Sequence, residues 1–277
     1  MKIKKFLTLI FLGFVFAALP GTLFGQTNPG KSNYEPQSGQ SGKDVVWVPT
    51  PHQLVDVMIK MANLTSSDFL VDLGSGDGRI VIAAAKKGIK AAGVEFNPDM
   101  VELSKRYAER EGVANRTDFI QADFFEYDLS KATVITMFLL PDLNRRLMPK
   151  LLELKPGTRI ITNSFSIDDW PYDEVEELDD EDISWNIAYM WIVPAKVEGL
   201  WKFSGGEMVL SQFYQTVEGT MKIGSESYRI TDGKLRGNVL SFNCSGVNYK
   251  CIVNNNEMKG TVERGGKASA WGAAKVQ

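Results

Sequence analysis

The residues best suited to chemistry lie in one short stretch, Asp72-Leu73-Gly74-Ser75-Gly76-Asp77-Gly78. An acidic side chain ends an apolar run, and three glycines then alternate with Ser75 and Asp77 before a helical pattern resumes at Ile80. A glycine turn between a strand and a helix brings backbone N–H groups and a helix N-terminus up to a ligand. Side chains at the glycine positions would block that approach. The stretch therefore predicts a ligand site, with a plain strand-to-helix turn as the alternative.

The glycine spacing indicates which ligand is bound. A dinucleotide fingerprint has the spacing G-x-G-x-x-G, but the position that it keeps small is Arg79 here. The observed D-x-G-x-G-x-G resembles motif I of the class I S-adenosylmethionine (SAM) dependent methyltransferases. By this resemblance the Asp72 carboxylate accepts a hydrogen bond from the amino group of SAM. The resemblance implies a cofactor-binding set of Asp72, Gly74, Ser75, Gly76, Asp77 and Gly78.

Two further acids stand at the ends of expected strands. Glu95 lies nineteen residues after Gly76, a distance at which a carboxylate can accept the ribose hydroxyls. Its alternative is a surface side chain before the helix that starts at Asn97. Asp123 is expected to accept the adenine amino group, and Phe124 to cover the ring face. The alternative for this pair is a loop residue and a core residue.

The pattern as a whole supports a narrower resemblance. It consists of V-D-L-G-S-G-D-G-R-I-V-I, G-V-E-F-N-P, Q-A-D-F-F, F-L-L-P-D-L-N and L-K-P-G-T-R-I-I. Residues 45–195 are similar to the seven-β-strand protein-lysine methyltransferases that act on the mitochondrial ATP synthase c-subunit and the adenine nucleotide translocase. The resemblance implies SAM as cofactor and methyl transfer to an acceptor amine, with a protein lysine expected.

The acceptor is expected at the end of the fourth strand, because ligands in open α/β sheets lie off the carboxyl ends of strands. Pro141, Asp142 and Asn144 follow that strand and are the candidates for the acceptor channel. Asp142 is the nearest candidate for a general base, with a helix-capping role as the alternative. His52 is the only histidine, which excludes Ser-His-Asp chemistry and most histidine metal sites, and no metal is expected.

These residues need an α/β framework to position them. Apolar runs predict strands at 69–73, 91–95, 117–120, 132–140 and 158–165, and an antiparallel pair at 174–178 and 186–193. Helical patterns lie between them, including one over 143–154, and the first helix is expected to have Thr50 as its N-cap and Pro51 at its first position. We therefore expect an open Rossmann-like sheet of seven strands over residues 45–195.

The chain begins with a pattern typical of export. Lys2, Lys4 and Lys5 precede fourteen uncharged apolar residues, 6–19, which is short of the roughly 20 that span a bilayer. We expect residues 1–25 to be a signal peptide or an uncleaved anchor. Residues 26–44 are expected to be a flexible linker because they are rich in Gly, Ser, Gln and Asn. The protein is thus predicted to be exported, with a membrane tether if the anchor is retained.

The C-terminal part, residues 196–277, has no counterpart in the resemblance. Short alternating runs separated by turn signals such as Asp232-Gly233 and Gly265-Gly266 predict a small all-β domain, either an up-and-down sheet or a barrel. Cys244 and Cys251 flank an expected turn at 245–249. They form a disulfide across it or remain two buried thiols.

Charge and the open alternatives limit the function. Residues 46–195 carry 25 acidic against 15 basic side chains, which argues against nucleic acid as partner and suits a cationic acceptor. A SAM-dependent methyltransferase of protein lysine is the first hypothesis. A small-molecule or lipid-linked acceptor is the second. A non-catalytic module that binds a nucleoside or envelope components is the third.

Overall fold

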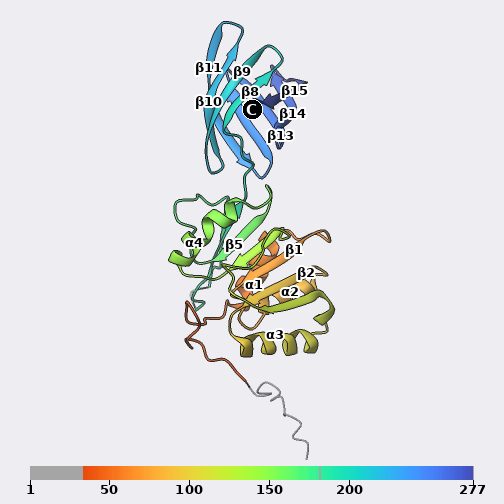
Figure 1. Cartoon of the computed structure of the whole chain (residues 1–277), viewed down its shortest axis with the longest axis vertical. Coiled ribbons are helices and arrows are strands. Elements are labelled where there is room, and N and C mark those ends of the chain that lie inside the picture. The colour runs from red at the N-terminus through yellow and green to blue at the C-terminus, as the bar shows by residue number, and fades with distance from the viewer. Residues whose placement is uncertain (1–33, 181, 277) are drawn as a thin grey trace, which may run out of the picture. The chain divides into compact units, whose positions relative to one another are not determined.

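The computed structural model describes residues 34–180 and 182–276. The expected signal peptide or anchor, and the first part of the expected linker, lie outside the described residues. Two bodies of secondary structure follow one another along the described chain, a mixed seven-stranded sheet with helices and a closed barrel of eight strands (Figure 1).

The sheet has the strand order β3-β2-β1-β4-β5-β7-β6. β1 to β5 are parallel, whereas β7 runs antiparallel to β5 and β6 antiparallel to β7. This is the α/β fold that the sequence predicts. Its strands are β1 (Phe69–Leu73), β2 (Lys90–Glu95), β3 (Thr117–Gln121), β4 (Val134–Met137), β5 (Arg159–Asn163), β6 (Glu174–Glu177) and β7 (Ile187–Ile192).

The helices cover both faces of the sheet, because neighbouring strand residues point to opposite sides. Leu70 packs in one core cluster with α1, α2 and α3, and Val71 packs in a second cluster with α4. The helices are α1 (His52–Met61), α2 (Arg79–Lys86), α3 (Pro98–Arg110) and α4 (Pro141–Leu152), with a 3-10 turn η1 (Ala114–Arg116) after α3. Within the described residues, no helix has the length and apolar character needed to cross a membrane.

Two helix starts differ from the expectation. The N-cap of α1 is Pro51 rather than Thr50, and no side chain caps this helix. Thr50 is buried instead, where its carbonyl oxygen accepts a hydrogen bond from Arg79 and its hydroxyl one from Asn163. α4 begins at Pro141, two residues before its expected start, because Pro141 takes the first helical position, where its missing N–H is not needed.

The C-terminal strands close into a barrel, drawn in blue tones in Figure 1. Each strand pairs with its chain neighbour, and β15 pairs with β8 to close the ring. The side chains of one face fill the interior, with Trp201, Met221 and Leu240 fully buried. The strands are β8 (Gly199–Phe203), β9 (Gly206–Phe213), β10 (Thr216–Ile223), β11 (Glu226–Arg236), β12 (Val239–Cys244), β13 (Val247–Asn254), β14 (Glu257–Arg264) and β15 (Lys267–Lys275).

Two turn expectations in this part are wrong. Asp232-Gly233 does not separate strands but forms an irregularity inside β11, where Gly233 passes close to the Val217 backbone. The turn after β12 is shorter than expected, because Cys244 pairs with Val247. Cys251 pairs with Leu240 instead of facing Cys244, so both cysteines are buried free thiols.

Candidate functional site

The glycine turn after β1 has a backbone conformation, with positive φ, that residues with a side chain rarely adopt. Gly74, Gly76 and Gly78 have φ of 72°, 54° and 78°. A Cβ on Gly76 would lie 2.5 Å from Nε1 of Trp47, and a Cβ on Gly78 would lie 2.6 Å from the Phe119 ring. Gly74 and Gly76 line the pocket described below, whereas Gly78 lets the turn pack against the core.

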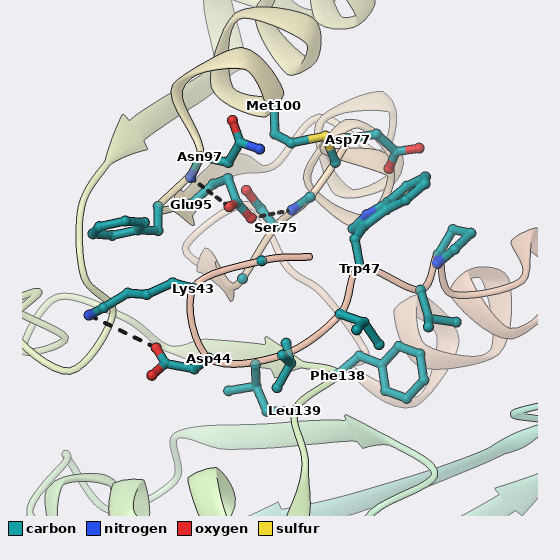
Figure 2. Close-up of a pocket in the computed structure, with 18 of the residues that line it drawn as sticks. Lys43, Asp44, Trp47, Ser75, Asp77, Glu95, Asn97, Met100, Phe138 and Leu139 are labelled. Carbon is teal, nitrogen blue, oxygen red and sulfur yellow. Dashed lines mark hydrogen bonds and ion pairs between the residues drawn. The ribbon is translucent and has the colours of Figure 1, made fainter. Parts of the chain in front are cut away.

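Of the predicted carboxylates, Glu95 lies beside this turn (Figure 2), and Asp72 lines the same pocket. Glu95 Oε2 accepts a hydrogen bond from the Gly76 N–H at 3.0 Å, and its Oε1 accepts one from the Asn97 N–H at 2.8 Å. Asp72 is buried, and Thr136 Oγ1 donates to its Oδ1 at 2.7 Å. Burial raises the pKa of the Asp72 carboxyl to about 7.

The two polar residues between the glycines have different surroundings. Ser75 Oγ is buried and has no hydrogen-bond partner among the described residues. Asp77 forms an ion pair with Arg79 at 2.6 Å, and Arg79 Nη1 also donates to the Thr50 carbonyl oxygen at 2.7 Å. Both residues line the pocket, but the charge of Asp77 is already balanced, and the pair ties the turn to the start of α1.

The predicted adenine side of the pocket contains a cation that the sequence argument missed. The Asp123 carboxylate pairs with Lys43 Nζ, and its Oδ1 accepts a hydrogen bond from the Phe125 N–H at 2.9 Å. The hydrogen bond with Lys43 lowers the pKa of Asp123. Phe124 is 8% exposed and lines the pocket.

Lys43 belongs to a segment that we call the strap, residues 40–49. Its backbone folds back on itself, with Trp47 N–H donating to the Gln40 carbonyl oxygen at 2.8 Å. Gln40, Lys43 and Trp47 all line the pocket, and the Trp47 indole lies across it from Glu95 (Figure 2). Residues 45–48 are a short apolar run in the sequence, but no local signal places this run over the glycine turn.

The acceptor candidates are separated by the structure. Asp142 is exposed and pairs with Arg145, and Pro141 is exposed at the start of α4. Asn144 is fully buried, and its Nδ2 donates to the Phe165 and Ser166 carbonyl oxygens at 3.4 and 3.1 Å. None of the three lines the pocket. The same segment instead contributes Phe138 and Leu139, which directly follow β4.

These parts line one pocket, and its chemistry can be compared with that of a nucleoside carrying an amino-acid tail. The pocket fits such a ligand chemically, since it combines backbone exposed at glycines, a buried unpartnered hydroxyl on Ser75 and acids at three strand ends. His52 is exposed and not part of the lining. Within residues 34–180 and 182–276 no cluster of acidic, His or Cys side chains is arranged to hold a metal.

Known proteins resemble the sheet-and-helix part of the chain. Residues 72–174 match the ANTKMT methyltransferase domain family. A protein-lysine N-methyltransferase of Saccharolobus islandicus (strain REY15A) is 41% identical over 152 residues, which is 54% of this chain and 94% of that protein. The adenine nucleotide translocase lysine N-methyltransferase of Mus musculus is 37% identical over 103 residues, which is 36% of this chain and 45% of that protein.

One solved structure has the same level of identity. It is an RNA methyltransferase from Salinibacter ruber in complex with S-adenosyl-L-homocysteine. It is 41% identical, covers 54% of this chain and 96% of its own, and superposes with a TM-score of 0.51. None of these similarities extends over much more than half of the chain.

Proposed function

We propose that this chain, which belongs to the protein-lysine N-methyltransferase family, transfers a methyl group from SAM to the side chain of a protein lysine. It is a SAM-dependent methyltransferase. The observation that carries the proposal is the convergence of Asp72, Glu95 and Asp123 with the glycine turn around one pocket.

Each of these groups has a part in holding the cofactor. The Asp72 carboxyl would hold the amino group of SAM, Glu95 the ribose hydroxyls, and Asp123 with Phe124 the adenine. When bound, SAM supplies a methyl group already activated on a sulfonium. What remains for the protein is to align the acceptor and exclude water.

The acceptor lysine must lose a proton from a group whose pKa is normally about 10.4. No general base is needed if the amine is desolvated, because burial lowers the pKa of an ammonium group. Phe138 and the buried Leu139 supply apolar surface where the acceptor must approach. Asp142 is exposed and paired with Arg145, which favours a surface role over proton transfer.

The test begins with the purified protein and radiolabelled SAM. Isothermal titration should detect SAM binding to the unaltered protein and no SAM binding to the Asp72→Ala variant. Methyl transfer to envelope proteins, followed by acid hydrolysis, should yield methyl-lysines. Label only in material extracted into organic solvent would favour a small-molecule or lipid-linked acceptor, and binding without any transfer would favour a non-catalytic module.

A second acceptor class is suggested by the Salinibacter ruber protein, which is described as an RNA methyltransferase. The acidic excess over residues 46–195 disfavours a phosphate backbone as partner. Ribonuclease treatment of the labelled products separates the two classes. Label that ribonuclease releases would replace lysine with RNA as the acceptor.

We further propose that the enzyme acts outside the cytoplasm. The support is the basic start at Lys2, Lys4 and Lys5 followed by the apolar stretch 6–19. Mass spectrometry of the native protein should find a mature N-terminus near residue 26, or an intact N-terminus in the membrane fraction if the stretch remains as a tether. An intact, freely soluble protein would refute export.

A further inference from the structure

Three aromatic side chains meet beside the cofactor pocket. Phe138 follows β4, Phe165 follows β5, and Trp185 lies just before β7. The Phe138 and Phe165 ring centroids are 6.1 Å apart, and Trp185 lies 5.6 Å from each. Phe138 also lines the pocket, whereas Trp185 is 43% exposed. These three rings, which we call the aromatic wall, therefore lead from the pocket to the surface.

The wall lies on the side of the pocket away from the predicted adenosine contacts. Across the sheet edge the strand order is β3, β2, β1, β4, β5, β7. Asp123 and Glu95 follow β3 and β2, and the glycine turn follows β1. Phe138 and Phe165 continue this row after β4 and β5. A cofactor held by the first three strand ends leaves the last three for the acceptor.

The backbone beneath the wall is held in an unusual conformation. Trp185 and Ser164 have φ of 63° and 60°, in the left-handed region that non-glycine residues rarely adopt. The Ser164 N–H donates to the Ile187 carbonyl oxygen at 2.7 Å, which joins the two segments. The Phe165 carbonyl oxygen accepts from Thr162 Oγ1 at 2.6 Å and from Asn144. Backbone strain of this kind is concentrated at ligand clamps and active sites, which favours a binding role for the exposed Trp185.

Acidic side chains precede the outermost residue of the wall in the same loop. The loop that connects β6 to β7 carries Asp179, Asp180 and Asp182, and Trp185 lies at its end. All three carboxylates are exposed, and among the described residues none of them forms an ion pair. We call these three residues the acidic rim. Their free charge attracts cations to the entrance of the wall.

We propose that the aromatic wall receives the acceptor lysine and that the acidic rim selects a lysine within a basic protein segment. This inference rests on the proposed function and specifies its substrate. The rings attract the arriving ammonium through their faces and pack against its methylene stem. Once the amine lies against apolar rings, burial favours its neutral form, so the proton passes to water and the lone pair is free for methyl transfer. The rim binds the neighbouring positive charges of the same segment.

The test measures peptide binding and turnover separately. The probes are short fluorescent peptides with one lysine flanked by arginines or by glutamates, titrated in the presence of S-adenosylhomocysteine. We expect the arginine-flanked peptide to bind more tightly. Trp185→Ala should weaken binding of the arginine-flanked peptide and raise the KM for that peptide about five-fold. Trp185→Phe should bind this peptide nearly as tightly as the unaltered protein does. SAM affinity should not change in either variant.

A matched control is Ile252→Ala, which removes an apolar side chain that is 55% exposed on the barrel. It should bind peptide as the unaltered protein does. Replacing Asp179, Asp180 and Asp182 by asparagine should abolish the preference for arginine-flanked peptides without changing SAM affinity. Unchanged peptide binding in Trp185→Ala and in the asparagine variant would overturn the inference, even if methyl-lysine is formed. Failure of the unaltered protein to methylate any protein would overturn the proposed function instead.

Discussion

The buried Asp72 carboxyl predicts that SAM binding depends on pH. Burial raises its pKa to about 7, and the nearby Asp77 and Glu95 carboxylates add to the shift, against the hydrogen bond from Thr136. In the free protein at pH 6 the carboxyl is therefore mostly neutral. It must ionise to balance the protonated amino group of SAM, so binding releases a proton in this range.

The size of the effect follows from the shift. Each pH unit below the folded pKa lowers the ionised fraction about tenfold, which costs about 1.4 kcal/mol of binding free energy. An α-amino group itself titrates at about 7.7–8.0, so affinity should fall again at higher pH and the profile should be bell-shaped. With both groups counted, the Kd for SAM should be on the order of 50-fold higher at pH 5 than at pH 7.5.

Isothermal titration across this pH range measures the profile. Buffers of different ionisation enthalpy should report net release of about 0.4 proton per SAM at pH 7, because proton uptake by the SAM amino group offsets part of the release from Asp72. Asp72→Asn keeps the side-chain size and the hydrogen-bond acceptor for Thr136, but the variant should bind SAM weakly at pH 7.5. Its SAM affinity should also no longer fall as the pH is lowered below 7. Asp142→Asn removes an exposed acid, and its SAM affinity should still fall in that pH range. A Kd that stays constant from pH 5 to 7 would refute the assignment of Asp72.

Three further outcomes test the rest of the site. Gly78→Ala should lower the free energy of unfolding, measured by urea denaturation, by about 2–5 kcal/mol, because the added Cβ would meet Phe119 and the φ of this residue is positive. The control is Gly112→Ala, which has a similar φ but open space around it and should lower the free energy of unfolding by only about 1–2 kcal/mol. Lys43→Ala should tighten SAM binding about two- to five-fold by freeing the Asp123 carboxylate, and Lys105→Ala, which breaks an exposed pair elsewhere, should not. Glu95→Ala should weaken SAM binding by about 1–3 kcal/mol, and an unchanged Kd would remove Glu95 from the ribose site.

The shared pocket of Asp72, Glu95 and the glycine turn could be predicted because these parts follow one another in the sequence. Asp72 to Gly78 is one unbroken strand end and turn, and its backbone requires glycine at three positions. Glu95 ends the next strand, which pairs directly with β1. Parallel neighbouring strands have their carboxyl ends at the same edge of the sheet. Residues at the ends of two successive strands are therefore expected to lie close together.

Features that depend on distant contacts could not be predicted. Lys43 reaches Asp123 across 80 residues, and nothing in the composition of the expected linker indicates that pair. Thr50 has the residue type and position of an N-cap, but it is buried and accepts hydrogen bonds from Arg79 and Asn163. Local preference predicted a cap there, but these tertiary contacts use Thr50 instead.

The barrel gives the same contrast. Its strands were visible from alternation, because one face is buried and the other is exposed. Its closure depends on the pairing of β15 with β8, at opposite ends of the segment. The two cysteines illustrate the effect of a shorter turn, since pairing Cys244 with Val247 moves Cys251 opposite Leu240 and leaves two separate thiols.

The proposed cofactor and acceptor sides therefore differ in construction, and this has a consequence for specificity. In our proposal SAM is held largely by the backbone and acids of one contiguous turn and its neighbouring strand ends. The proposed acceptor side uses side chains from three separate segments, at Phe138, Phe165 and Trp185, of which Phe138 lines the pocket. Loops at strand ends accept substitutions without disturbing the sheet beneath them. Exchanging the loop that connects β6 to β7 for that of a relative should thus change which protein is methylated while leaving the Kd for SAM unaltered, and a large change in that Kd would contradict this division of the site.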